Sequence, residues 1–317
     1  MRALLATAAV LALVGCTAAE APTPAADGAS AARSYTLAPT DIAAFFDCVS
    51  RESGTLVSAH RGGPAPGYAE NAIETFAHTL TLAPASLEAD VAVTRDGVLV
   101  LMHDETLERT TTGRGPVSAV TAAEISALQL RDNAGNVLDA HPPTLAEALA
   151  WADGKTILDL DIKQGVRFED VVAAVREANA QNRVVLVTYS DGAAIRLHRL
   201  APELMLYVTI ESDAHAARLE RAGVDLSRVI AWTGTREPNS ELNVALAQRG
   251  IESRFGTLGR PDQSWDARFA REGDEGYAAF AETGLEQIAT DRPAEAFRAI
   301  DAADGDGYAP QRCLAAQ

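Results

Sequence analysis

Short β-rich runs alternate with amphipathic segments along most of this chain, and that alternation constrains the fold more than any other feature. The eight runs span residues 55–59, 87–93, 156–162, 184–188, 205–210, 229–233, 252–257 and 287–290. The segments between them carry apolar residues at helical spacing and end near glycine, asparagine or proline. No Gly-x-Gly-x-x-Gly fingerprint follows the first run, so an α/β fold of the (β/α)8 TIM-barrel type is favoured over an open doubly wound sheet.

The regular alternation is interrupted once, after the second predicted strand. Residues 97–132, GVLVLMHDETLERTTTGRGPVSAVTAAEISALQLRD, lead on to Pro143 before the helical pattern TLAEALAWA resumes. We call residues 97–143 the excursion. Catalytic groups of such barrels lie at the carboxyl ends of the strands, where this segment begins. We therefore expect a small insertion over the barrel mouth rather than a separate domain.

The N-terminal residues have the pattern of an export signal. Arg2 precedes the apolar run Ala3–Leu13, which is too short to span a bilayer. The run ends in Leu13-Val14-Gly15-Cys16, which resembles the bacterial lipobox, where the peptide is removed before a cysteine that is lipidated. We predict a lipoprotein signal peptide over residues 1–15. An ordinary signal peptide with a chance cysteine is the alternative.

The same resemblance predicts a location. Thr17, rather than an acidic residue, follows Cys16, which under the sorting rule of these signals favours the outer membrane facing the periplasm. Residues 16–39 are rich in Ala, Thr, Pro and Ser and predict a flexible tether. The folded domain is predicted over residues 40–317, in the bacterial cell envelope, with its lipid anchor as its membrane contact.

The charge of the chain narrows the class of partner. Its formal net charge of −17 argues against nucleic acid, because a phosphate-binding surface normally shows a basic face. An anionic substrate would have to be bound by a local group of cations. The sequence leaves the oligomeric state open.

Two cysteines remain once Cys16 is assigned to the lipid. Cys48 and Cys313 form an even pair in an oxidising compartment and lie near opposite ends of the predicted domain. Since a closed barrel brings its ends together, we expect a disulfide between the first helix and the C-terminal tail. Two unpaired buried thiols are the alternative.

Acidic residues gather at the ends of two predicted strands. Glu88 and Asp90 stand two apart in SLEADVAV, and Asp159, Asp161 and Lys163 stand two apart in ILDLDIK. Residues two apart on a strand face the same side. Burying such carboxylates together is costly unless they are paired or hold a cation, and ligation by oxygen alone suits Mg²⁺ or Ca²⁺. The alternative for any single one is to cap a helix or pair with an arginine.

Two histidines lie beside this predicted cluster. His60 ends the first strand and opens the turn His60-Arg61-Gly62-Gly63, whose cation and glycines suit an anion, and His103 follows the run GVLVLM. Two histidines at the rim of a carboxylate cluster can serve as a general acid and a general base near neutral pH. The other histidines are predicted as surface or packing residues: His78, His141, His198 and His215.

Five ordered motifs resemble the glycerophosphodiester phosphodiesterase family, from about Leu56 to the C-terminus. They are HRGGPAPGYAENAIETF, LEADVAVTRDGVLVLMHDETLERTTTGRGPV, PTLAEAL, LDLDIK and IATDRP. That family is a (β/α)8 barrel that hydrolyses glycerophosphodiesters to glycerol phosphate and an alcohol with a divalent metal. The resemblance implies a small-molecule glycerophosphodiester as substrate and one divalent cation, Mg²⁺ or Ca²⁺, as cofactor.

Carried over by position, the resemblance implies roles for individual residues in three groups. The acid/base pair is His60 and His103; the substrate-binding residues are Arg61, Lys163 and Glu70; the metal ligands are Glu88, Asp90 and Asp161. The resemblance leaves open which histidine is the acid. It also leaves open whether water or the neighbouring glycerol hydroxyl, through a cyclic phosphate, is the nucleophile.

The chain departs from the family pattern at several positions. Asp161 stands where the family usually has a glutamate, one methylene longer, and in this interpretation Asp159 is an auxiliary oxygen ligand. Ala69 replaces the proline before Glu70, and SRFGTLG stands where many relatives have a tryptophan and an asparagine. Two alternatives remain: a lipid phosphodiesterase of the sphingomyelinase or phospholipase D type, and a non-catalytic lipoprotein that binds phosphate or metal.

Overall fold

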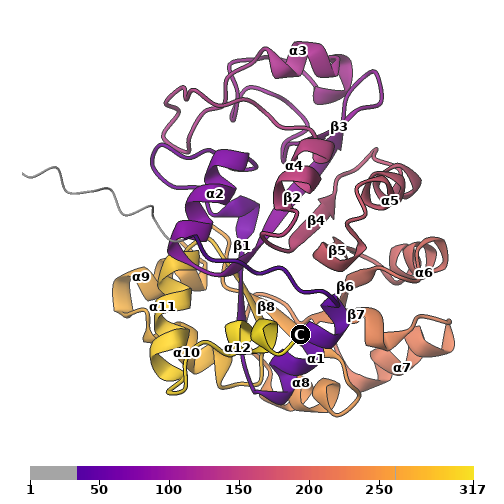
Figure 1. Ribbon diagram of the computed structural model, residues 1–317, viewed down its shortest axis with the longest axis vertical. Helices are drawn as coiled ribbons and strands as arrows, with labels where there is room; N and C mark the ends of the chain where they lie inside the picture. The colour runs from indigo at the N-terminus through magenta and orange to yellow at the C-terminus, as the bar shows by residue number, and fades with distance from the viewer. Residues whose placement is uncertain (1–33, 261) are drawn as a thin grey trace, which may run out of the picture. The chain divides into compact units, whose positions relative to one another are not determined.

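The computed structural model describes residues 34–260 and 262–317. Within them a nine-stranded sheet runs in the order β1-β9-β8-β7-β6-β5-β4-β2-β3, and β1 also pairs with β2, which closes the barrel (Figure 1). The parallel strands are β1 (Leu56–Ala59), β2 (Ala85–Val93), β4 (Leu158–Ile162), β5 (Val184–Val187), β6 (Met205–Thr209), β7 (Val229–Trp232), β8 (Glu252–Gly256) and β9 (Gln287–Thr290). The predicted (β/α)8 barrel is confirmed, and each predicted run coincides with one of these strands.

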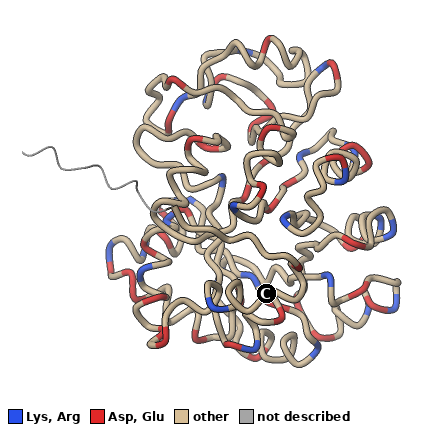
Figure 2. Tube along the Cα trace, in the orientation of Figure 1, with Lys and Arg blue, Asp and Glu red and all other residues tan. Residues whose placement is uncertain are grey.

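Helices surround the barrel, and several begin at a side-chain cap. Ser190, Ser212 and Ser264 each accept the backbone N–H three residues on, and Thr144 forms a capping box with Glu147. The helices are α1 (Ile42–Arg51), α2 (Ile73–Leu82), α4 (Leu145–Ala152), α5 (Phe168–Glu177), α6 (Asp191–Leu200), α7 (Asp213–Arg221), α8 (Ser240–Ala247), α9 (Trp265–Glu272), α10 (Glu275–Ala281), α11 (Pro293–Ala303) and α12 (Ala309–Ala315). Figure 2 shows basic residues interspersed with acidic ones around this ring. Across residues 34–260 and 262–317, none of the helices has the length and apolar character that a membrane crossing requires.

The excursion adds a small lobe after β2. It contributes β3 (Leu99–Leu101), which pairs antiparallel with β2, and α3 (Ala122–Ser126), both at the top of the view in Figure 1. An apolar cluster that includes Val100, Leu107 and Ile125 holds the lobe together. The predicted insertion after the second strand is confirmed, whereas the strand inside it was not predicted.

Helix α1 covers the amino-terminal end of the barrel. Its Phe45 and Phe46 are fully buried in one cluster with a layer of side chains that point into the barrel. That layer contains Leu56, Ile157, Val185, Met205 and Ile230. An apolar plug at this end leaves the carboxyl ends of the strands as the face open to chemistry, as in other barrels of this type.

The two ends of the folded unit are joined. A disulfide links Cys48 of α1 to Cys313 of α12, with Cα atoms 5.7 Å apart, and Figure 1 shows the two helices side by side. Leu37 is fully buried, and its N–H donates to the Lys155 carbonyl at 2.7 Å. The compact unit that contains the barrel spans Ser34–Gln317. Cys16 and the predicted signal peptide lie outside the described residues.

A buried carboxyl group lies at the amino-terminal end of β8. Glu252 is 4% exposed, and burial, with the charges of Glu286 and Asp47, raises its pKa from 4.5 to about 8. The folded protein therefore holds this proton more tightly than the unfolded chain does. Below the pKa of the unfolded chain, Glu252 is protonated in both states and does not lower the free energy of unfolding. As the pH rises from that value to the folded pKa, the free energy of unfolding falls. Above the folded pKa the loss is complete and stays constant.

We expect Glu252→Gln to raise Tm at about pH 9 and to change it far less at about pH 5, because the substitution removes the ionisation that burial opposes. Each pKa unit corresponds to roughly 1.4 kcal/mol. Thermal unfolding followed by circular dichroism at the two pH values measures the difference. Glu241→Gln, at an exposed position of α8, is the control and should change Tm little at either pH. Equal effects of Glu252→Gln at both pH values would contradict the raised pKa.

Candidate active site

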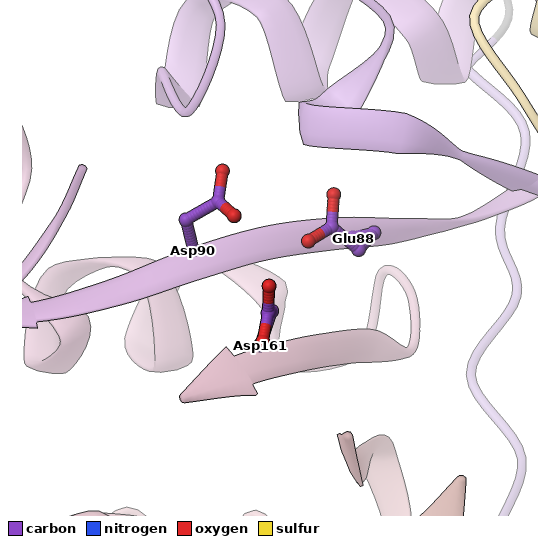
Figure 3. A group of neighbouring side chains, drawn as sticks. All are labelled: Glu88, Asp90 and Asp161. Carbon is purple, nitrogen blue, oxygen red and sulfur yellow. The ribbon is translucent and has the colours of Figure 1, made fainter. Parts of the chain in front are cut away.

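Three carboxylates meet near the carboxyl ends of neighbouring strands. Glu88 and Asp90 project from β2 and Asp161 from β4, and Figure 3 shows their carboxylates facing a common space. One oxygen of each lies within 4.8 Å of the others, and all three residues are buried. Asp90 and Asp161 are partners in the register of the two strands. Glu88, two residues earlier, reaches the same level with its longer side chain.

Neighbouring cations and donors offset part of this charge. The Nζ atom of Lys163 lies 2.6 Å from Asp90 Oδ1 and 2.6 Å from Asp161 Oδ2. The backbone N–H of Arg61 donates to Glu88 Oε2 at 2.6 Å. Although burial alone would raise the pKa of Asp90, the charge and hydrogen bond of Lys163 lower it below its usual value.

The compensation is incomplete at two of the carboxylates. Asp161 Oδ1 is buried and has no hydrogen-bond partner among the described residues. Burial, and then the charge of Asp90, raises the pKa of Glu88 from 4.5 to about 8. An orphaned buried oxygen and a carboxylate that resists ionisation are both costly, and a bound cation would relieve both. The three oxygen ligands therefore fit a hard divalent cation.

A tight turn after β1 aims the main chain at this cluster. Arg61, Gly62 and Gly63 have φ of 50°, 82° and 80°. At Gly62 a Cβ atom would lie 2.3 Å from the ring of Phe76 in α2, so glycine is required there by space as well as by conformation. The strained conformation of Arg61 turns its N–H towards Glu88.

His60 is held by an aspartate from the far end of the chain. Its Nδ1 lies 2.7 Å from Asp291 Oδ1, just after β9, and the other Asp291 oxygen accepts the Gly259 N–H at 3.3 Å. Burial alone would lower the pKa of His60, but the hydrogen bond to Asp291 and the charges of Glu88 and Asp291 raise it above its usual value. With Nδ1 donating to a carboxylate, Nε2 is the nitrogen left for chemistry.

The second histidine has the same arrangement on a different element. His103 Nδ1 lies 2.8 Å from Asp104 Oδ1. Strand β3 brings it here, since the N–H of the preceding Met102 donates to the Asp90 carbonyl at 2.8 Å. The excursion thus delivers a second imidazole to the carboxylate cluster.

Glu70 is enclosed by two arginines. Its oxygens accept from Arg61 Nη1 at 3.2 and 3.1 Å, and from Arg109 Nη2 and Nη1 at 2.7 and 2.8 Å. The structure therefore places the carboxylate of Glu70 against two guanidinium groups.

Asp159 lies deeper in the barrel than the three clustered carboxylates. Its Oδ2 accepts from Ser58, Ser86 and Arg254 at 2.7, 3.0 and 3.0 Å, and its Oδ1 from the Tyr207 hydroxyl at 2.9 Å. The guanidinium of Arg254 also stacks on the Tyr207 ring at 4.1 Å. The structure does not bring Asp159 into the carboxylate cluster. Its four donors hold it in a buried ion pair.

A cavity of about 180 Å³ opens beside the cluster. His60, Glu88 and Asp161 line it, together with Tyr189 and Trp232. The Tyr189 hydroxyl donates to Asp161 Oδ2 at 2.8 Å. Neither aromatic residue was predicted, although both lie at carboxyl ends of strands, which is the signal that could have found them.

Three partner residues also escaped prediction: Asp104, Arg109 and Asp291. Each stands inside a motif that carries the family resemblance, HDETLER or IATDRP. For Asp104 the available signal was its place directly after His103 in the sequence.

Comparisons with known proteins decide the family. The model of the glycerophosphoryl diester phosphodiesterase family matches residues 60–248, which include both histidines, Arg61, Lys163 and the three clustered carboxylates. This chain belongs to that family. The prediction from the motifs is confirmed, and with it the assignment of the chain to a family of phosphodiesterases.

Individual relatives agree with this assignment. A glycerophosphodiester phosphodiesterase of Caldanaerobacter subterraneus subsp. tengcongensis is 33% identical over 159 residues, 48% of this chain and 65% of that protein, so the match spans slightly less than two thirds of that relative. The crystal structure of a glycerophosphoryl diester phosphodiesterase from Parabacteroides distasonis is 31% identical, with a TM-score of 0.75 over 86% of this chain and 95% of that one. A phosphodiesterase of Oleispira antarctica, solved in complex with the product sn-glycerol-3-phosphate, is 22% identical, with a TM-score of 0.60 over 80% and 99%. At that lower identity the likeness shows the fold alone.

We expect Asp291→Asn to lower the pKa of His60 in the metal-free protein, because it removes the charge and weakens the hydrogen bond that raise this pKa. NMR titration of the histidine ring signals measures the change. Asp274→Asn removes the partner of Arg292, at 2.6 Å, and is a nearby control that should leave the His60 pKa unchanged. A His60 pKa that stays the same in Asp291→Asn would exclude the aspartate as its partner.

Proposed function

We propose that this protein hydrolyses glycerophosphodiesters to glycerol phosphate and an alcohol, with one divalent cation, Mg²⁺ or Ca²⁺. The observation that carries the proposal is the buried trio Glu88, Asp90 and Asp161 beside a cavity that His60 also lines. Family membership supports the reaction type. The product named for the Oleispira antarctica relative supports glycerol phosphate as one product.

The cation would be held by one oxygen from each carboxylate of the trio. Bound there, it supplies Lewis-acid stabilisation of the charge that gathers on the phosphoryl oxygens. Asp161 is a suitable ligand despite its short side chain, because it lies level with Asp90 and its Oδ1 has no donor among the described residues. Asp159, with four donors on its carboxylate, is better assigned to the support of the barrel interior than to the cation.

Arg61 and Lys163 would bind the phosphate. Both side chains are partly exposed at the edge of the cluster, so an anionic group can approach them. Fixed cations at this edge favour a phosphodiester in a chain whose net charge is −17. Glu70 would keep Arg61 in place.

The two histidines would move the protons. Breaking the phosphorus–oxygen bond needs a proton for the departing alkoxide, and the nucleophile must lose one. His60 and His103 each have Nδ1 on an aspartate, so each can present Nε2 to the substrate. One is the acid and the other the base, with water or the neighbouring glycerol hydroxyl as nucleophile.

The dimensions of the site favour a small substrate. A cavity of about 180 Å³ suits a deacylated glycerophosphodiester better than an intact lipid, which an enzyme of the sphingomyelinase or phospholipase D type would have to admit. Two aspartate-bound histidines also favour catalysis over a protein that only binds phosphate or metal.

The proposed location is the bacterial cell envelope, with a lipid anchor at Cys16 in the outer membrane facing the periplasm. The lipobox-like residues 13–16 support it. The disulfide between Cys48 and Cys313 supports an oxidising compartment.

We expect EDTA to abolish hydrolysis of glycerophosphocholine and glycerophosphoethanolamine by the purified protein, and Mg²⁺ or Ca²⁺ to restore it. Asp161→Ala should raise the metal concentration needed for half-maximal activity steeply, since one charged ligand of three is lost. Asp153→Ala, at an exposed position before β4, is the control and should titrate like the parent. Full activity after exhaustive chelation would contradict a role for the metal.

We expect His60→Ala and His103→Ala each to lower kcat by roughly 10²-fold or more with little change in Tm, because general acid–base groups typically contribute that much. Steady-state kinetics on glycerophosphocholine provide the measurement. His141→Ala changes an exposed histidine of the excursion, bonded to the Leu128 carbonyl, and should keep near-parental kcat. Normal turnover in either of the first two variants would remove that histidine from the mechanism.

A further inference from the structure

A continuous series of ion pairs connects the second histidine to the proposed phosphate-binding arginine. His103 Nδ1 lies 2.8 Å from Asp104 Oδ1. Arg109 donates to both oxygens of Asp104, from Nε at 2.6 Å and from Nη2 at 2.9 Å. The same guanidinium donates to both oxygens of Glu70, at 2.8 and 2.7 Å. Glu70 in turn accepts from Arg61 Nη1 at 3.2 and 3.1 Å.

The inner part of this series is shielded from solvent. The side chain of Glu70 is 4% exposed, whereas that of Arg109 is 45% exposed. Buried pairs are screened less than surface pairs, and the planar fork of arginine sets direction as well as distance. Arg109 uses one edge of its planar guanidinium for each carboxylate, Nε and Nη2 for Asp104 and Nη1 and Nη2 for Glu70, so the two carboxylates cannot move independently while both pairs are intact.

The position of His103 depends on its ion pairs because His103 lies beyond the end of a strand. Strand β3 ends at Leu101, and the N–H of Met102 bonds back to the Asp90 carbonyl just before His103. From there the chain runs on through the rest of the excursion, beyond the end of β3. Arg61, by contrast, follows β1 of the barrel itself. Two groups proposed to act on one phosphodiester therefore stand on separate elements, and Arg109 connects them.

We propose that Arg109 is a positioning residue of the active site, which sets His103 relative to Arg61 by binding Asp104 and Glu70 at once. The inference rests on the function proposed for His103 and Arg61, and Arg109 touches no reacting atom in it. Arginine suits the role because one planar group presents donors to two carboxylates. Lysine offers a single point charge and cannot hold both in fixed directions.

A merely structural role predicts a different result. Loss of a partly exposed ion pair from the excursion would lower Tm modestly and leave kcat and KM unchanged at temperatures well under Tm. A positioning role predicts that both kinetic constants change, because Arg61 affects binding and His103 affects the chemical step.

The test compares Arg109→Gln with Arg131→Gln in the full chain. Arg131 also belongs to the excursion, but its guanidinium donates to the backbone carbonyls of Thr111 and Gly135, at 2.9 and 3.0 Å, and not to this series. We expect Arg109→Gln to lower kcat/KM for glycerophosphocholine by roughly 10²-fold at saturating Mg²⁺, with lower kcat and higher KM, since small misplacements of reacting groups have effects of that order. Arg131→Gln should stay within about twofold of the parent.

Two further variants separate positioning from folding. Arg109→Lys keeps the charge but loses the fork, and its kcat/KM should fall between the parent and Arg109→Gln. Asp104→Asn breaks the series at the histidine. If Arg109 acts through Asp104, the double variant should be little worse than the poorer single variant, whereas independent effects would multiply.

A second readout does not need turnover. In the parent, ring ¹⁵N shifts should show the proton of neutral His103 on Nδ1, because Asp104 accepts it there. In Arg109→Gln the shifts should move towards a mixture of tautomers. The imidazole of His60, held by Asp291, should keep its shifts and serves as the control within the same molecule.

The proposal is overturned if Arg109→Gln keeps kcat/KM within about twofold of the parent, if its effect multiplies with that of Asp104→Asn, or if the His103 tautomer does not change. Failure of the proposed function would look different, since the parent itself would then hydrolyse no glycerophosphodiester. In that case the ¹⁵N shifts alone would decide whether Arg109 positions His103.

Discussion

The hydrogen bonds that close the barrel on both sides of β1 determine where every group of the site can lie. β1 pairs with β9 from Leu56↔Gln287 to Ala59↔Thr290, and with β2 from Val57↔Ala85 to Ala59↔Leu87. His60 and Asp291 each follow directly after these paired strands, which is why they meet at 2.7 Å. The same closure brings the Arg61 N–H to Glu88. A register shift of one residue would turn these side chains to opposite faces and separate the groups.

Depth along the strands decides which buried carboxylates belong to the cluster proposed to hold the cation. Residues two apart on a strand share a face but differ by roughly 6.6 Å along it. Asp159 lies opposite Glu88 in the register of β2 and β4, one level under Asp90 and Asp161. Glu88 reaches the upper level because its side chain is longer, whereas Asp159 stays with Arg254. The expectation that Asp159 would be an auxiliary ligand used the shared face of the strand and lacked this depth.

The barrel strands were predictable because most are short β-rich runs between turn residues, and their alternation with helices repeats through the chain. Strand β3 has only three residues, and so short a strand carries no usable period. The clustered carboxylates were predictable from strand position and from the motifs. Their neighbours were not: Asp291 lies 231 residues from His60, and only closure of the sheet shows that the two are partners.

The site has two parts, one on the strands of the barrel and one on the excursion, and different interactions hold each part in place. Strand register holds the three clustered carboxylates, so the cluster depends on the closed barrel. His103 stands on the excursion, which is joined to the barrel by the β2–β3 pairing and, through Arg109, by the pair with Glu70. In the positioning role proposed for Arg109, its contacts with Asp104 and Glu70 add to the strand pairing and set His103 relative to Arg61.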